Sequence, residues 1–280
     1  APILPSSYTV LGPPIAAGTY TIGTTVTSTY PTITAAALDF SLRGIAGAVT
    51  YELVDPAYNS TTGETFPIVF GNTLGTSASN TITIRPIANN NGVVVTSLNT
   101  TATFDLNGSQ FLTFDGRPGG TGSFVTGSSL SIINTATAAP AIRLVNEANN
   151  NRILYCDLQS NNTTATTATS GAGVVCIGGT TGANGNDNNT ISFCDIHNVT
   201  GGNPLIGVYG YGSATSVAAN NDSNYVTNCN IYDFFSAASA TAGIYVGVNN
   251  GYWRMNNNRF YQTATLTITG AVVHRAIWCT

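Results

Sequence analysis

One short stretch returns three times in this chain, as Asn151-Arg-Ile-Leu-Tyr-Cys156-Asp-Leu158, Asn189-Thr-Ile-Ser-Phe-Cys194-Asp-Ile196 and Asn224-Tyr-Val-Thr-Asn-Cys229-Asn-Ile231. Each copy has Asn first, Cys five residues later, and an aliphatic residue two positions after the Cys. A degraded fourth copy runs from Trp253 to Phe260, with Asn258 in the position of the Cys. The copies begin 38, 35 and 29 residues apart. Self-similarity at such periods indicates a solenoid or an array of repeats.

A second apolar run lies between the copies, at residues 141–145, 173–177, 205–209, 243–247 and 276–279. Both kinds of run are short, rich in aliphatic residues and bounded by Gly, Asn, Ser and Thr, which is typical of strands. Two strand-like segments therefore alternate within each period. Equivalent strands one period apart would lie roughly 4.8 Å from each other in a parallel sheet. The sequence thus predicts an all-β parallel β-helix solenoid.

The repeated Cys and Asn positions predict two ladders of stacked side chains. A small apolar Cys side chain suits the interior, and Asn suits a turn because it tolerates left-handed backbone and can bond to a neighbouring Asn. Both ladders are expected to hold the fold together, and the thiols are expected to be free. The ladder residues are Cys156, Cys194, Cys229, Asn151, Asn189 and Asn224.

The remainder of the chain predicts one domain with a helical cap. Residues 1–17 are rich in Pro and are expected to be extended, and residues 18–280 are expected to form a single β-helix domain. Within it, the stretch from about 31 to 44 has the start, the Ala-rich interior and the Gly stop of a helix. A lone amphipathic helix before a solenoid is expected to cover the first turn. Regular repeats are expected over about 139–280.

Composition limits the classes of partner. Charged residues make up 7% of the chain, all eight cations are Arg, and the formal net charge is −4. Such a chain has no basic footprint for nucleic acid. It also has no apolar run long enough to span a membrane. No motif in it predicts a cofactor. A polar surface without lysine fits an extracellular or cell-surface location.

Several segments together resemble a known group of proteins. They are 18–23, the helix at 30–44 with 47–51, 77–84, 106–115 and the Asn-Asn-x-Ile-x-x-Cys-x-Ile repeats. This combination is similar to the right-handed parallel β-helix (pectin-lyase-like) region of large secreted Bacteroidetes-type cell-surface proteins. The resemblance covers nearly the whole chain. It implies a right-handed coil and a secreted protein, and it implies no particular activity.

Carboxylates that recur on neighbouring turns are the candidates for chemistry. Asp157 and Asp195 follow the Cys in consecutive repeats, so they should point outward about one strand spacing apart. In an enzyme that cleaves polysaccharides, Asp157, Asp195 and Asp233 would form the acid/base group, with His197 or Arg259 assisting. Asp157 and Asp195 are also a candidate calcium pair, although calcium prefers six to eight oxygen ligands. Alternatively, these Asp residues are ordinary turn residues.

Two classes of function remain open from the sequence. The leading hypothesis is a non-catalytic extracellular structural protein, either a surface adhesin or a filament-forming subunit. The alternative is a β-helix protein that cleaves or binds polysaccharide, with Tyr and Trp side chains in the loops available for stacking on sugars. The strand at 276–279 has no capping segment after it. An open turn of this kind predicts head-to-tail self-association through the ends of the rod. A glycan or another cell-surface ligand is the other expected partner.

Overall fold

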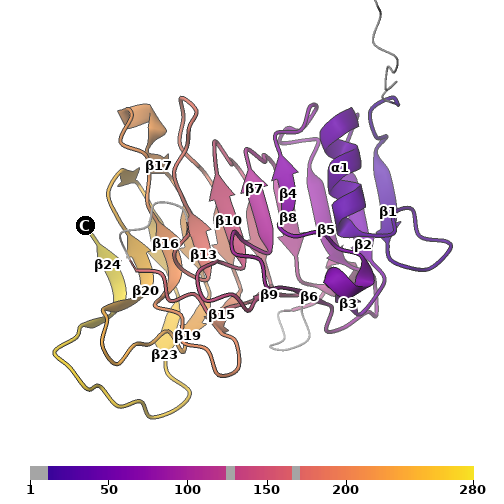
Figure 1. Ribbon diagram of the computed structural model, residues 1–280. Helices are drawn as coiled ribbons and strands as arrows, with labels where there is room; N and C mark the ends of the chain where they lie inside the picture. The colour runs from indigo at the N-terminus through magenta and orange to yellow at the C-terminus, as the bar shows by residue number, and fades with distance from the viewer. Residues whose placement is uncertain (1–11, 124–129, 166–170) are drawn as a thin grey trace, which may run out of the picture.

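The chain winds into a rod of stacked parallel strands (Figure 1). The computed structural model describes residues 12–123, 130–165 and 171–280, so most of the segment expected to be extended, residues 1–11, lies outside the described part. Within the described residues, the strands form three long sheets in which all neighbouring strands run parallel. A parallel β-solenoid with one short helix near its N-terminus confirms the predicted fold class.

The three sheets extend along the whole rod, and the chain visits them in turn. Sheet 1 contains β1 (Gly18–Ile22), β2 (Val49–Leu53), β5 (Ile82–Pro86), β8 (Leu112–Asp115), β11 (Arg152–Leu154), β14 (Thr190–Ser192), β18 (Tyr225–Thr227) and β22 (Arg254–Asn256). Sheet 2 contains β3 (Ala57–Tyr58), β6 (Val94–Ser97), β9 (Ser131–Asn134), β12 (Asp157–Ser160), β15 (Asp195–Asn198), β19 (Asn230–Tyr232) and β23 (Arg259–Tyr261). Sheet 3 contains β4 (Ile68–Gly71), β7 (Phe104–Asn107), β10 (Ile142–Val145), β13 (Val175–Ile177), β16 (Ile206–Gly210), β20 (Thr241–Val246) and β24 (His274–Cys279).

Smaller elements lie in the connections. A two-stranded parallel sheet joins β17 (Asn221–Asp222) to β21 (Asn250–Gly251). Short 3-10 helices occupy Ser60–Thr62, Pro118–Gly120 and Val217–Ala219.

Each turn of the coil holds three strands, so the expectation of two strand-like segments per period was wrong. The repeat that begins at Asn151 contains β11, a corner, and then β12. At the corner the backbone of Tyr155 turns through the left-handed region, with φ 56°, and Phe193 and Asn228 do the same one and two turns later. A single left-handed residue bends the chain sharply between two strands, which a pattern of apolar residues alone does not reveal.

The helix α1 (Ile33–Arg43) packs on the first part of the coil, within the range expected for the cap. The Thr32 side chain accepts a hydrogen bond from the Ala35 N–H at 3.0 Å, and the buried Glu64 carboxylate accepts from the N–H of Ile33 at 2.7 Å. Both acceptors satisfy N–H groups that the first helical turn leaves unpaired. Buried Phe40 stacks on Phe70 of β4, with ring centroids 5.3 Å apart. The helix therefore covers sheet 3 beside its first strand.

Within the described residues, no helix has the length and apolar character that a membrane crossing requires.

The Asn ladder lies at the start of the sheet 1 strands. Asn151, Asn189 and Asn224 are each at most 1% exposed. The Asn189 Oδ1 atom accepts from both the backbone N–H and the side-chain amide of Asn151, at 3.0 and 3.1 Å. Asn224 accepts from Asn189 in the same way, at 2.9 and 3.1 Å. The Asn151 and Asn189 amides therefore bond to the turn before and the turn after, Asn224 bonds to the turn before it, and no buried amide group of this ladder lacks a partner.

The Cys residues line the inner side of the corner between sheets 1 and 2. Cys156, Cys194 and Cys229 are at most 1% exposed, and all are free thiols. The backbone N–H of Asp195 donates to the Cys156 carbonyl at 3.0 Å, and that of Asn230 donates to the Cys194 carbonyl at 2.9 Å. These bonds place the three Cys residues in one column, one per turn. Burial raises the pKa of the Cys194 thiol well above its usual value, which keeps this side chain neutral.

The degraded fourth copy keeps the bonding pattern with different residues. The Asn side-chain amides of the ladder donate to a carbonyl one turn earlier, as Asn224 does to Asn186 at 2.9 Å. Trp253, in the Asn position, donates its indole N–H to the equivalent carbonyl of Asn221 at 2.9 Å. Asn258, in the Cys position, donates its side-chain amide to the Val226 carbonyl one turn earlier at 2.8 Å, as the thiols of the Cys column do to the equivalent carbonyls. The substitutions therefore preserve the hydrogen bonds between turns.

Candidate functional site

The outer face of sheet 2 carries the predicted acidic residues. Strands β12 and β15 pair in register, so Asp157 lies beside Asp195 and Gln159 beside His197. Leu158 and the residue paired with it belong to the core, which turns the flanking side chains outward. Although they point away from the core, Asp157 and Asp195 are only 8% and 2% exposed. Neighbouring side chains must therefore cover these carboxylates.

Asp157 is held by three hydrogen-bond donors. His197 Nε2 donates to Asp157 Oδ1 at 2.8 Å. Ser131 Oγ and Gln159 Nε2 both donate to Asp157 Oδ2, at 2.9 and 2.8 Å. The donors come from three consecutive turns, β9, β12 and β15, so the carboxylate ties these turns together.

The same contacts shift the pKa of both partners. Burial by itself raises the pKa of Asp157, but the hydrogen bond and positive charge of His197, together with Ser131 and Gln159, bring it below its usual range. Burial lowers the pKa of His197, and the hydrogen bond and charge of Asp157 outweigh that effect, so its pKa lies above the usual value. The geometry therefore favours a charged pair, with a carboxylate and an imidazolium.

Aromatic rings close the site on the side of the later turns. The imidazole of His197 stacks on Tyr232 with centroids 4.4 Å apart and an angle of 11°. Tyr232 stacks in turn on Tyr261 at 4.8 Å. Asp195 accepts a hydrogen bond from Asn230 Nδ2 at 2.8 Å. Burial and the nearby charge of Asp195 raise the pKa of the Tyr232 hydroxyl, which keeps this ring neutral.

Asp233 and Arg259 do not join this cluster. Asp233 lies beyond β19, where its two carboxylate oxygens accept from the backbone N–H and the hydroxyl of Thr263, at 2.7 and 2.6 Å. Arg259 follows Asn230 on the outer column of sheet 2, and its guanidinium lies 5.8 Å from the centre of the Tyr261 ring. The structure therefore brings together Asp157, Asp195 and His197, and leaves Asp233 in a separate loop contact.

The arrangement offers little to a substrate. A cavity of about 470 Å³ lies on the same sheet, and its walls include Thr96, Ile133 and Gln159 but none of the five predicted catalytic residues. Both oxygens of Asp157 already accept bonds from protein donors. Among the described residues, no group of three or more acidic, His or Cys side chains is placed to hold a metal ion. A calcium ion at Asp157 and Asp195 would have to displace His197 and Asn230.

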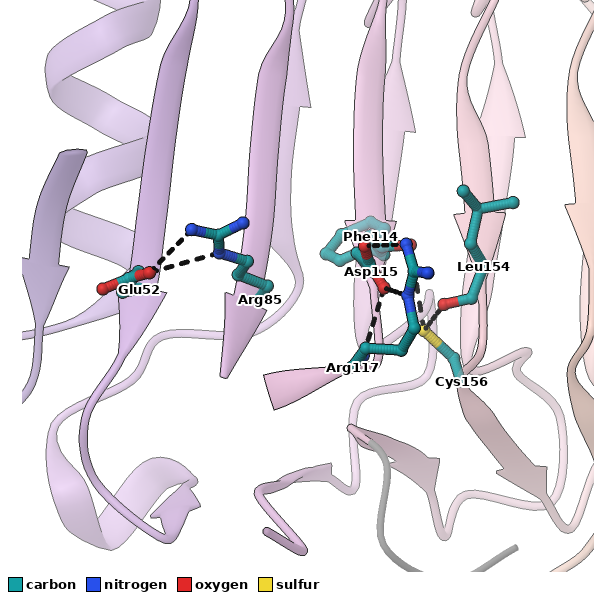
Figure 2. A network of polar contacts seen from close by, with 7 residues as sticks. All are labelled: Glu52, Arg85, Phe114, Asp115, Arg117, Leu154 and Cys156. Carbon is teal, nitrogen blue, oxygen red and sulfur yellow. Dashed lines mark hydrogen bonds and ion pairs between the residues drawn. The ribbon is translucent and has the colours of Figure 1, made fainter. Parts of the chain in front are cut away.

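A second polar cluster lies on the outer face of sheet 1 (Figure 2). Arg85 Nη2 donates to Glu52 at 2.9 Å, between β5 and β2. Arg117 Nε and Nη2 donate to the two oxygens of Asp115, at 2.9 and 2.8 Å. The Arg117 guanidinium also lies 4.1 Å from the centre of the Tyr155 ring. A groove of about 540 Å³ opens over these residues and is lined by Arg85, Asp115, Arg117, Arg152, Thr113 and Tyr155.

The sequence interpretation missed this groove. Arg85 and Arg152 occupy outward positions of strands whose other residues are apolar or carry hydroxyls, and that pattern is a usable signal. The signal was weak because these positions are 67 residues apart in the sequence and meet only through the register of sheet 1.

Comparisons of the chain with protein-family models, with curated proteins and with solved structures find no match.

Proposed function

We propose that this chain is a non-catalytic structural protein of the cell exterior, a rigid β-solenoid that presents its outer faces for adhesion. The observation that carries the proposal is the way in which its candidate catalytic groups are used. Asp157 bonds to donors on three turns, Asp195 to Asn230, and Asp233 to Thr263. These carboxylates link one turn to the next, which is the task of a scaffold.

The ladders support the same conclusion. Asn and Cys side chains repeat once per turn over the three turns that begin with β11, β14 and β18, and stacked rings continue into the next, so these turns are bonded to their neighbours at several places. An array of this kind resists local opening, because one turn cannot separate without breaking bonds to both neighbours. Stiffness over a long distance is useful in a protein that holds a binding surface away from a cell.

An assay for turnover tests the proposal against its enzymatic alternative. The purified chain is incubated with a panel of neutral and acidic polysaccharides, and new reducing ends and unsaturated products are measured. We expect no product above that of the Asp157→Asn variant. Product formed by the wild-type chain and lost in Asp157→Asn would overturn the proposal. Retention of beads coated with the chain on glycan-coated surfaces, compared with albumin-coated beads, measures adhesion directly.

End-to-end association belongs to the same proposal. Met255, Phe260 and Ile277 occupy inward positions of the last turn, yet Ile277 is 41% exposed and the other two are partly exposed. The first turn instead carries α1, which exposes Leu38 and Leu42. Sedimentation velocity over a range of concentrations should show reversible growth for the wild-type chain and less for Ile277→Lys. A single species at all concentrations would contradict this part of the proposal.

A further inference from the structure

We propose that the groove over β5, β8 and β11 on sheet 1 binds an anionic glycan, and that the guanidinium of Arg152 holds the acidic group of the sugar. The inference rests on the proposed adhesive function and names the ligand class and the face that binds it. Four observations support it: the shape of the groove, its charge, the position of Arg152, and the polar groups around it.

The groove has the size of a ligand site, and its walls are mainly polar. Its volume of about 540 Å³ falls within the range of about 300–1,000 Å³ that is typical of small-molecule sites. The walls carry hydroxyls from Thr81, Thr83 and Thr113 and the side chain of Asn150. Hydroxyl and amide groups are suitable partners for sugar hydroxyls, because each can donate and accept.

The charge of the groove is positive in a chain that is acidic overall. Its three guanidinium groups, from Arg85, Arg117 and Arg152, face two carboxylates, those of Glu52 and Asp115. Arg85 and Arg117 are paired with these carboxylates. The side chain of Arg152 is exposed, and within the described residues it makes no hydrogen bond, ion pair or ring contact. One guanidinium with all its donors available therefore remains in the groove.

Arg152 interrupts a run of Thr residues in the column in which it lies. Along the outer face of sheet 1, Thr50, Thr83 and Thr113 stack in register, and Thr190 follows Arg152 on the next turn. Neither core packing nor an ion pair accounts for Arg at this place, so a ligand outside the protein is the partner that its charge lacks.

A second guanidinium in the lining of the same groove is fixed by its own contacts. Arg117 uses Nε and Nη2 for Asp115 and rests on Tyr155, so its Nη1 group takes no part in these bonds (Figure 2). A planar carboxylate or a sulfate ester fits the fork of N–H donors that Arg presents. One unpaired cation in the groove of a chain with net charge −4 is too little for a nucleic acid backbone, which needs many phosphate contacts. The chemistry therefore favours a hydroxylated ligand with isolated single charges, which describes an acidic glycan.

The test measures binding of three oligosaccharides to the whole chain by isothermal titration calorimetry. Unsulfated chondroitin hexasaccharide carries carboxylates only, a sulfated galactose oligosaccharide carries sulfate esters only, and carboxyl-reduced chondroitin is neutral. We expect one of the two anionic probes to bind and the neutral probe to bind at least about ten-fold more weakly, because a charge-assisted hydrogen bond is lost. The stronger of the two identifies the acidic group. Equal binding of all three, or of none, overturns the inference.

Two variants with the same change in net charge make the test specific. Arg152→Gln should weaken binding about ten-fold, whereas Arg254→Gln should leave it within about two-fold. Arg254 is a matched control because it lies in the same outer column of sheet 1, three turns further on, outside the groove. Equal losses in both variants would show nonspecific attraction and overturn the inference. Failure here would leave the turnover assay unaffected, so the two proposals fail independently.

Discussion

At the scale of single residues, the Asn ladder shows how a polar core is made stable. An Asn side chain has two donors and one acceptor with two lone pairs, so it can serve two neighbours at once. Asn189 does so: its oxygen accepts twice from Asn151, and its amide donates to Ala148 and to Asn224. Asn189 stabilises the fold because its side chain gives the buried polar groups around it their hydrogen-bond partners.

Asn189→Ala is therefore expected to cost about 2–4 kcal/mol of unfolding free energy. The loss arises because the Asn151 N–H and the Ala148 carbonyl would be buried without a partner. Chemical denaturation monitored by circular dichroism measures it. The control is Asn203→Ala, at an exposed loop position, which should change stability by less than about 0.5 kcal/mol. Similar effects of both substitutions would show that the ladder contributes little.

Asp187 and Asp222 lie on neighbouring turns and form a pair of like charge. Asp187 Oδ1 accepts from the backbone N–H of Asp222 at 2.7 Å, and on the previous turn Asn149 accepts from the N–H of Asp187 through its side chain. Burial and the nearby charge of Asp222 raise the pKa of Asp187. Ionised Asp187 is thus less favourable in the folded chain than in the unfolded chain.

Asp187→Asn should stabilise the protein at neutral pH by about 0.5–1 kcal/mol, because Asn keeps the acceptor for Asp222 and removes the repulsion. The sign follows from the raised pKa. The penalty in the wild-type chain is absent below pH about 3.8 and grows as the pH rises through the raised pKa of Asp187. Melting temperatures of the two chains should therefore diverge as the pH rises from 3.5 to 7. A constant difference over this range would contradict the assignment.

At the scale of elements, the Asp157–His197 pair joins β12 to β15 across sheet 2. The lowered pKa of Asp157 gives a contribution that is present above its usual pKa and is lost as the pH falls through the lowered value. The raised pKa of His197 gives a contribution that is present below its usual pKa and is lost as the pH rises through the raised value. Both contributions are complete only between about pH 4 and 6.5.

We therefore expect maximal stability in that window, with a fall of about 1–2 kcal/mol toward pH 9 that His197→Gln abolishes. Gln is the matched substitution because it can donate to Asp157 without carrying a charge. Urea denaturation at several pH values, together with an NMR titration of the His197 ring, measures both quantities. A titration midpoint below 6.5, or a pH profile that His197→Gln leaves unchanged, would show that the pair is not charged in the folded chain.

The sequence predicted the solenoid and its ladders but not the number of strands in each turn. The corners between strands explain this difference. The solenoid and its ladders were predictable because Asn151, Asn189 and Asn224 recur at the period of one turn, and a stacked side chain has to recur with it. The bend at Tyr155 was not predictable, because Tyr and Phe rarely adopt left-handed backbone and nothing marks the position as a corner. Because the corner was not predicted, the residues of β11 and β12 were predicted to form one strand.

The sites were predicted less well than the fold. The sequence placed Asp157 and Asp195 beside each other, and the structure has them so. It could not predict that Ser131, Gln159 and His197 would use up the carboxylate of Asp157, because those contacts depend on side-chain geometry. The groove joins Arg152, which lies in the first copy of the repeat, to β5 and β8, whose sequences carry no recognisable repeat, so the register between them was hidden.

At the scale of the whole molecule, stability is expected to vary along the rod. Each turn contacts only the turns before and after it, so the free energy of opening depends on how many neighbours a turn has and how much apolar surface they bury. The turn of β11, β12 and β13 is covered on both sides, and its core residues Ile153 and Leu158 are at most 1% exposed. In the last turn, the inward-facing Ile277 is 41% exposed.

Hydrogen exchange resolved by peptide should therefore show strong protection in β11, β12 and β13 and a decrease toward β22, β23 and β24. A backbone amide of the last turn exchanges after one interface between turns is broken, whereas one of the middle turn requires two to open. Repeating the measurement at higher protein concentration separates protection by neighbouring turns of the same copy from protection by association with another copy. If the last turn associates head-to-tail with another copy, the amides at the two ends of the rod should become slower to exchange, and those of the middle turns should not. Uniform protection along the rod at low concentration would mean that the solenoid opens as one cooperative unit, against the view of stability as a sum over neighbouring turns.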